Sequence, residues 1–313
     1  KFWKMKYIKY LPIALMLCLC SCKSGNATSQ ATDIPQDSIK TFTLPAIPAM
    51  LNTPELRADF LVRHYWDNVN FADTNYIHHP DITEQAWADY CDILNHVPLR
   101  TAQEVMKETI QKTEVERKMF DHITELADKY LYDPNSPLRN EEFYIPVLEA
   151  MVASPILSET EKIRPQARLE LAQKNRVGTK ALDFTYTLAS GAQGTLYQIK
   201  SDYTLLFINN PGCHACTETI EALKSIPMVS ELIKKKKLTI LSLYPDEELD
   251  EWRKHRSEFP AEWINGYDKS FTIKTKNLYD LKAIPTLYLL DANKKVLLKD
   301  ATTQAIYDNL PMQ

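Results

Sequence analysis

The distribution of glycine divides this chain into two parts that must fold differently. None of the six glycines lies between Gly25 and Gly178, and five of them fall from Gly178 onward. A long stretch without glycine is typical of helices joined by proline and Asp/Asn turns, whereas glycine is typical of hairpins and tight turns. The sequence therefore predicts an all-α domain over residues 41–172 and a strand-containing domain over residues 177–313.

Helix signals recur throughout the first of these parts. Thr53-Pro54 predicts an N-cap followed by proline at the first helical position. Ser158-Glu159-Thr160-Glu161 has the pattern of a capping box, and Thr83 and Thr101 are further candidate caps. We expect five or six helices whose apolar stripes meet in one core.

Three features of the helical part leave alternatives open. Its aromatic residues could line a ligand groove, but at these spacings they are more often core; they are Tyr65, Trp66, Tyr76, Trp87 and Tyr90. Cys91 stands at helical spacing between Trp87 and Leu94, which favours packing over a redox role. His78-His79 could indicate a metal site, yet no further ligand is spaced to complete one, so we predict none.

The apolar period changes after Val177. Segments 184–188 and 195–199 are strand-like and flank the turn residues 190–194, which predicts a hairpin. Further strands are expected at 205–208, 238–243, 284–290 and 295–298, with helices between them and a last helix at about 303–310. Strands that alternate with helices predict a mixed sheet covered on both faces, hence an α/β fold for this part.

Two cysteines stand where a predicted strand meets a predicted helix. The apolar strand ending at Ile208 leads through a short turn to Cys213 and Cys216, on the first turn of the helix. Cysteines at this spacing can close a small disulfide ring, and the helix N-terminus is expected to stabilise a thiolate on Cys213. A zinc site would need a second pair of ligands, which the sequence does not supply. Redox chemistry is therefore the favoured function.

This arrangement, with Ile284-Pro285-Thr286 opening a late strand, resembles the thioredoxin superfamily. It is most similar to the TlpA/ResA-like envelope oxidoreductases, whose module overlaps the peroxiredoxin-type (AhpC/TSA) family in shape. The resemblance covers about residues 177–313 and implies a thioredoxin-like fold in which the late proline is cis and faces the thiols. The preceding helical part resembles an uncharacterised domain found ahead of thioredoxin modules in Gram-negative lipoproteins.

The resemblance implies roles for the site residues. Cys213 is expected to attack a substrate disulfide, and Cys216 to resolve the mixed disulfide that results. The backbone of Ile284 and Pro285 is expected to pair with the substrate. His214, if protonated, would further favour the Cys213 thiolate; the alternative is an exposed residue without that role. No cofactor is expected beyond the cysteine pair, and the expected partners are protein thiols or disulfides and an envelope redox partner.

Three positions depart from the family pattern. Thioredoxin has a tryptophan just before the first cysteine and an acid in the preceding strand, where this chain has Gly212 and Phe207. Without that acid, Cys216 would depend on another base or on water, so the direction of electron flow is not fixed. A thiol peroxidase would need a threonine where Asn210 stands, which makes that alternative minor. A further alternative is a binding protein whose helical domain holds a peptide or glycan while the thioredoxin-like module is scaffold.

The first residues resemble a bacterial lipoprotein signal. Basic residues precede an apolar run, and Leu19-Cys20-Ser21-Cys22 resembles a lipobox. We expect residues 1–21 to be removed, Cys22 to be lipidated and residues 22–40 to form a flexible tether. Lys23 then favours the outer membrane, with the protein facing the periplasm. The alternative is an ordinary secretion signal.

Charge and cysteine count agree with an envelope protein. Removal of the four lysines in the signal would change the formal net charge from −4 to about −8, which argues against nucleic acid as a partner. Of the six cysteines, only Cys91, Cys213 and Cys216 would then remain as thiols. One close pair and one isolated cysteine is the number expected of a redox site plus a buried residue, without a structural disulfide framework.

Overall fold

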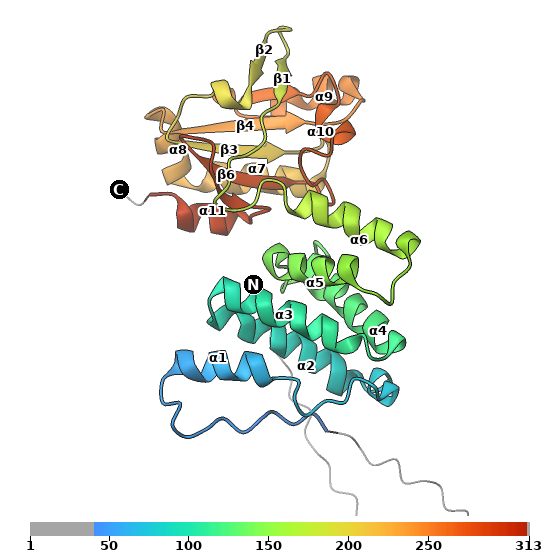
Figure 1. The fold of residues 1–313 in the computed structure, drawn as a ribbon. Coiled ribbons are helices and arrows are strands. Elements are labelled where there is room, and N and C mark those ends of the chain that lie inside the picture. Colours follow the sequence, from blue (N-terminus) through green and yellow to red (C-terminus); the bar gives the residue numbers. More distant parts are fainter. Residues whose placement is uncertain (1–40, 312–313) are drawn as a thin grey trace, which may run out of the picture. The chain divides into compact units, whose positions relative to one another are not determined.

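The computed structural model describes residues 41–311, in which a helical stretch precedes the described strands (Figure 1). The predicted signal peptide, the lipidation site Cys22 and the tether lie outside the described residues. We call residues 41–172 the helical region and residues 177–311 the sheet region.

The helical region contains six α-helices among the described residues, within the expected number. They are α1 (Pro54–His64), α2 (Pro80–Ile93), α3 (Leu99–Thr113), α4 (Arg117–Ala127), α5 (Glu141–Ala153) and α6 (Glu159–Ala172). Thr53 caps α1 by accepting a hydrogen bond from the Leu56 N–H at 3.3 Å. Ser158 and Glu161 form the predicted capping box of α6. These two caps are confirmed.

Two other predicted caps are wrong. Thr83 and Thr101 lie inside α2 and α3, which begin earlier, directly at Pro80 and directly after Pro98. Proline suits the start of a helix because its missing N–H would have no partner there and its φ is already helical. The Thr83 hydroxyl instead lies within hydrogen-bond distance of the carbonyl oxygens of Tyr76 and His79, at 3.3 and 3.4 Å, as helical threonines often do.

The helical region packs around a cluster of aromatic side chains. Trp87 and Tyr90 are fully buried with ring centroids 6.1 Å apart, and Tyr65 and Trp66 pack against them. These aromatic residues therefore belong to the core and do not line a groove. Cys91 lies in the same core, where burial raises the pKa of its thiol, so the packing interpretation of this cysteine is confirmed.

The sheet region contains seven strands among the described residues. They are β1 (Thr185–Leu188), β2 (Gln193–Thr195), β3 (Tyr203–Ile208), β4 (Leu238–Tyr244), β5 (Ile264–Tyr267), β6 (Thr286–Asp291) and β7 (Val296–Lys299). The helices between and after them are α7 (His214–Ser225), α8 (Pro227–Lys234), α9 (Leu249–His255), α10 (Thr272–Thr275) and α11 (Thr303–Asn309). The strand β5 was not among the predicted strands.

These strands form one mixed sheet in the order β2-β1-β5-β4-β3-β6-β7. β3 pairs in parallel with β4, and β4 with β5, while the other pairings are antiparallel. β3 lies in the interior of the sheet between β4 and β6, and its last residue, Ile208, lies opposite Thr286 at the start of β6. The loop that follows β3 and the loop that precedes β6 therefore leave the sheet at the same edge.

Both faces of the sheet are covered, as the alternating side chains of β3 require. Leu205 and Phe207 point to the face that α7, α8 and α11 cover. Leu206 and Ile208 point to the opposite face, where they pack with Ile273 of α10. The predicted mixed sheet with helices on both faces is confirmed.

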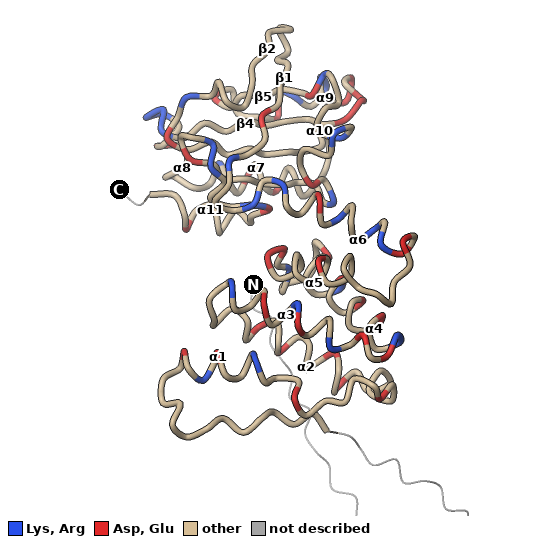
Figure 2. The backbone as a smooth tube through the Cα atoms, in the orientation of Figure 1, with Lys and Arg blue, Asp and Glu red and all other residues tan. Residues whose placement is uncertain are grey.

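Charged residues of both signs are interspersed along the helical and the sheet regions (Figure 2). Many of them pair, and several of the pairs join the two regions, for example Arg139 with Asp300 at 3.3 Å. No helix within the described residues has the length and apolar character needed to cross a membrane.

Candidate functional site

The two site cysteines are positioned by the junction of β3 and α7. Cys213 is the N-cap residue of α7, and Cys216 lies on its first turn. The Cys213 N–H donates to the carbonyl oxygen of Asn210 at 3.3 Å, which closes the turn between strand and helix. The end of β3 and this turn therefore fix where α7 begins, and the helix sets the spacing of the two thiols.

Gly212 is required by the backbone of this turn. Its φ is +75°, in the left-handed region that favours glycine over residues with a side chain. A Cβ placed there would have the His255 imidazole 3.9 Å away, an ordinary contact, so the constraint is conformational and not steric. This geometry accounts for glycine at the position where thioredoxin has tryptophan.

The proline loop completes the site. The Ile284–Pro285 peptide bond is cis, as the family resemblance implies. The Cys213 sulfur lies 3.9 Å from the Ile284 carbonyl oxygen. The structure thus brings the Cys213/Cys216 pair next to Ile284 and Pro285, although Cys213 and Ile284 are 71 residues apart in the sequence.

The two thiols differ sharply in environment. Both are free in this structure; Cys213 is partly exposed, whereas only 3% of the Cys216 surface is accessible. Burial raises the pKa of Cys216 to about 12, and the interaction with Cys213 adds to the rise. A hydrogen bond with the Asn210 backbone lowers the pKa of Cys216, but by less than burial raises it. Cys216 is therefore shielded and protonated at neutral pH.

Within the part of the chain that the structure describes, no carboxylate is among the groups that shift the pKa of Cys216. Phe207 is fully buried and packs edge-on against Trp263, with centroids 6.2 Å apart, in the core cluster that also holds Cys216. The nearby polar pair is neutral: Asn209 Nδ2 donates to the Ser242 hydroxyl at 2.8 Å. The surroundings that raise the pKa of Cys216 are consequently apolar, with no carboxylate at the position of the family acid.

His214 lies at the surface of α7. Its side chain is 88% exposed, and its Nδ1 lies 3.5 Å from a Glu218 carboxylate oxygen one turn along the helix. An exposed imidazole that faces Glu218 agrees with the alternative stated above, in which His214 is a surface residue that does not affect the Cys213 thiolate. A tuning role for His214 stays a prediction.

His255 of α9 is a neighbour of the site that the sequence did not point to. Its Nδ1 lies 2.7 Å from Glu258, and its Nε2 lies 3.5 Å from Glu251. The ring borders Gly212, the residue before Cys213. His255 comes from a helix of mixed charge far along the chain with no motif around it, so the local sequence pattern gave no signal for its position.

A groove beside the turn is acidic. It has a volume of about 410 Å³, and Asn210 and Pro211 of the turn contribute to its lining. Four acids and one lysine also line it: Asp246, Glu247, Glu248, Glu251 and Lys274. No group of three or more His, Cys, Asp or Glu side chains within residues 41–311 is arranged to hold a metal ion.

A second groove, of about 460 Å³, lies in the helical region between α4, α5 and α6. Apolar side chains such as Phe120 and Leu148 line it, and Arg164 and Arg168 lie at its border. Arg168 pairs with Asp128 at 2.7 Å. The groove combines an apolar lining with charges of both signs and lies apart from the aromatic core.

Comparison with known families gives two matches. Residues 201–296 match the family described as thioredoxin-like, and residues 20–175 match a domain of unknown function (DUF5106). No curated protein matches the sequence.

Solved structures give a match over most of the chain. A thioredoxin-like protein from Bacteroides caccae is 77% identical, with a TM-score of 0.85, and the match covers 87% of this chain and 98% of that one. The C-terminal domain of an uncharacterized protein from Bacteroides fragilis is 68% identical, with a TM-score of 0.43, over 44% of this chain and 97% of that one. A domain of a possible thiol-disulfide isomerase from Cytophaga hutchinsonii is 24% identical, with a TM-score of 0.38, over 44% of this chain and 92% of that one. The expected fold, helical and then thioredoxin-like, is confirmed.

Proposed function

Because this chain belongs to the family of thioredoxin-like proteins, we propose that it is a thiol-disulfide oxidoreductase of the cell envelope that acts on protein substrates. The observation that carries the proposal is the asymmetry of the cysteine pair. Cys213 is accessible at the start of α7 and borders the Ile284 carbonyl, while Cys216 is buried one turn behind it. An accessible thiol backed by a shielded one is the arrangement that two-step disulfide exchange requires.

The proposed reaction proceeds by two exchanges between sulfur atoms. The Cys213 thiolate attacks one sulfur of a substrate disulfide, forms a mixed disulfide and releases the other substrate sulfur as a thiolate. The Cys216 thiolate then attacks the Cys213 sulfur, which closes the Cys213–Cys216 disulfide and releases the second substrate thiol. Two electrons pass from the cysteine pair to the substrate. The reverse sequence oxidises a substrate dithiol, and a cellular dithiol or disulfide partner resets the pair.

The substrate is proposed to lie along the proline loop. Ile284 is partly exposed, and its carbonyl oxygen lies next to the reactive sulfur of Cys213. An extended substrate segment that pairs with the backbone at Ile284 and Pro285 would place its disulfide over Cys213. Recognition would thus depend on backbone pairing, which accepts varied substrate sequences.

Replacement of the resolving cysteine tests this function. With Cys216→Ser, Cys213 can still attack but the mixed disulfide cannot be resolved, so protein adducts should accumulate and disappear on addition of dithiothreitol. Non-reducing electrophoresis of cell extracts that express the full-length variant measures this. The control is the double variant Cys213→Ser/Cys216→Ser, which should trap nothing. Absence of adducts, together with a cysteine pair that does not titrate with redox buffer, would refute the function.

A second candidate function is ligand binding by the helical region. The apolar groove between α4, α5 and α6 favours it, because its volume would admit a peptide side chain or a sugar. The double cysteine variant separates the two functions. Suppose that cells with the double cysteine variant behave as wild-type cells do, while cells with substitutions in the groove behave as cells that lack the protein. Binding is then the function, and the thioredoxin-like part is scaffold.

We also propose that lipid attached to Cys22 anchors the protein at the outer membrane, facing the periplasm. The support is the lipobox-like pattern that ends at Cys22. Cys22→Ser should move the protein from the membrane fraction to the soluble periplasmic fraction, because the acyl chains supply the membrane affinity. Cys18→Ser, a change in the same segment, should leave the protein in the membrane fraction. Persistent membrane association of Cys22→Ser would contradict lipidation.

A further inference from the structure

The loop that carries Pro285 is held by residues outside the sheet region. We call residues 276–285, between α10 and β6, the proline loop. Lys174, just beyond α6, donates through Nζ to the Asn277 carbonyl oxygen at 2.8 Å. Asn175 Nδ2 donates to the Leu278 carbonyl oxygen at 2.7 Å. The start of the proline loop is therefore tied to the segment that leaves the helical region.

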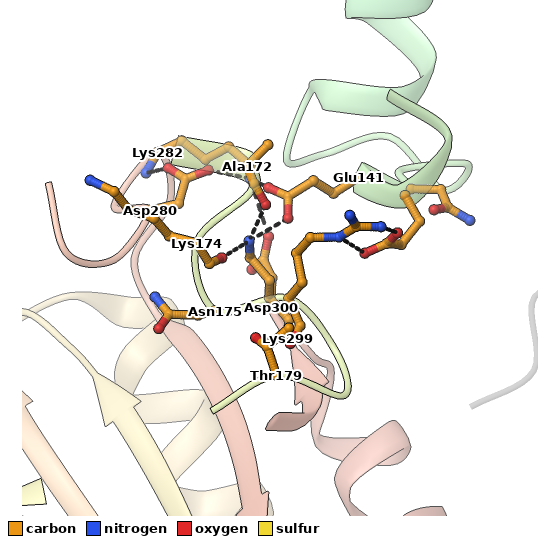
Figure 3. A network of polar contacts seen from close by, with 12 residues as sticks. Glu141, Ala172, Lys174, Asn175, Thr179, Asp280, Lys282, Lys299 and Asp300 are labelled. Carbon is orange, nitrogen blue, oxygen red and sulfur yellow. Dashed lines mark hydrogen bonds and ion pairs between the residues drawn. The ribbon is translucent and has the colours of Figure 1, made fainter. Parts of the chain in front are cut away.

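The helical region also contacts the proline loop directly, through Glu141 (Figure 3). Glu141 is the first residue of α5, and its Oε1 lies 4.0 Å from the Nζ of Lys282 in the loop. Its other carboxylate oxygen pairs with Lys299 of β7. Lys299 in turn donates to the Ala172 and Lys174 carbonyl oxygens at 3.1 and 2.7 Å. One carboxylate of the helical region thus contacts two lysines of the sheet region.

Lys282 lies at the centre of this network. Its Nζ is 2.6 Å from Asp280 and 3.5 Å from Asp300, and its side chain is only 13% exposed. The Lys282 N–H also donates to Asp280 at 2.9 Å, which closes the loop on itself. Three residues further on is Pro285, so a displacement of Lys282 would be transmitted to the backbone at Ile284.

Ion pairs shielded from water are suited to fixing a geometry. They contribute little net stability when desolvation is counted, and their attraction repays the desolvation cost only where the geometry is good. Apolar contacts at the same place would permit sliding. By this reasoning, the Glu141–Lys299 pair and the longer contact of Glu141 with Lys282 would fix the position of the proline loop more than they would strengthen the fold.

We propose that Glu141 is a positioning residue for substrate binding: by holding Lys282 and Lys299 it keeps the backbone at Ile284 and Pro285 facing Cys213. The inference rests on the proposed oxidoreductase function and gives the helical region a part in it. Loss of this contact leaves the thiols as they are. It weakens the docking of an extended substrate and has little effect on a disulfide too small to use the loop.

The test uses the full-length chain with Glu141→Gln, a change made wholly in the helical region. Reduction of a disulfide-linked peptide and of the small aromatic disulfide DTNB is measured by stopped flow. We expect kcat/KM for the peptide to fall about tenfold, mainly through a higher KM, while the DTNB rate stays within about twofold. Hydrogen exchange in residues 276–285 is expected to become faster.

Three further variants make the result specific. Lys282→Met should lower kcat/KM for the peptide as Glu141→Gln does. Lys282→Arg should keep kcat/KM for the peptide closer to the wild-type value, because arginine keeps the charge that Glu141 contacts. Arg176→Met breaks the neighbouring Arg176–Glu142 pair, which does not involve the proline loop, and should leave both rates unchanged. This set of variants distinguishes a specific effect on the proline loop from a general weakening of the contacts between the helical region and the sheet region.

Equal slowing of peptide and DTNB in Glu141→Gln, or no effect on either, overturns the positioning role while the oxidoreductase function stands. If Glu141→Gln fails to fold, equal peptide rates in Lys282→Met and Lys282→Arg overturn it. A wild-type chain that reduces neither disulfide overturns the function, and this inference with it.

Discussion

Resolution of the mixed disulfide by Cys216 is expected to accelerate about tenfold for each unit of pH between about pH 6 and pH 10. Only the thiolate attacks. In the reduced pair, burial and then the interaction with Cys213 raise the pKa of Cys216 to about 12, and the burial, which is the larger cause, persists in the mixed disulfide. Below that pKa, each unit of pH raises the thiolate fraction tenfold. At pH 7 this fraction is about 10⁻⁵, against about 10⁻² for a thiol with a pKa near 9. If the protein acts as proposed, deprotonation of the inner thiol is therefore expected to limit turnover.

Stopped-flow reaction of the reduced protein with excess DTNB measures this step. A first release of thionitrobenzoate reports attack by Cys213, and the second release reports attack by Cys216 on the mixed disulfide. The second phase should be missing in Cys216→Ser. A second phase whose rate levels off below about pH 9 would show that some group lowers the pKa of Cys216, contrary to its apolar surroundings beside Phe207.

Truncation of Trp87 to alanine is expected to lower the free energy of unfolding by about 3–5 kcal/mol. The indole is 0% exposed and packs against Tyr90 and Trp66, with ring centroids 6.1 and 6.4 Å away. Its removal leaves a cavity in the middle of the helical core that its rigid aromatic neighbours cannot fill. Urea denaturation followed by circular dichroism at 222 nm measures the loss.

Ile163→Ala is the matched control for this prediction. Ile163 is an apolar residue of the same region but is 66% exposed, so its truncation should change the free energy of unfolding by less than about 0.5 kcal/mol. Comparable losses in the two variants would mean that the aromatic cluster is not the stabilising core of the helical region.

The parts of the fold that could be predicted from sequence are those with a local signal. The apolar run of β3 and the cysteines that follow it specify strand, turn and helix within about a dozen residues. Pro285 could be assigned to the site because it precedes another apolar strand and because the family resemblance implies a proline that faces the thiols. Strand β5 had no such signal: Ile264–Tyr267 is four residues long and contains asparagine and glycine, which strands disfavour. Its pairing with β4 and β1 overrides that preference.

The surroundings of the site could not be predicted, because they depend on contacts between distant segments. Glu141 contacts Lys282, and His255 borders Gly212, through tertiary packing that leaves no periodicity in the sequence. The misplaced caps at Thr83 and Thr101 have a local cause. Threonine is a frequent N-cap, but the prolines a few residues earlier start both helices first.

The pairing of Ile208 with Thr286 has a consequence for the substrate docking proposed above. The next residue along β3, Asn209, and the residue before β6, Pro285, continue from adjacent hydrogen-bonded strands in the interior of the sheet. The distance between the turn that carries Cys213 and the backbone at Ile284 and Pro285 is thus set by the hydrogen-bonded spacing of two neighbouring strands. Under the proposed function, a substrate would have to adapt its own backbone to that fixed interval, and the protein would only exchange bonds between sulfur atoms.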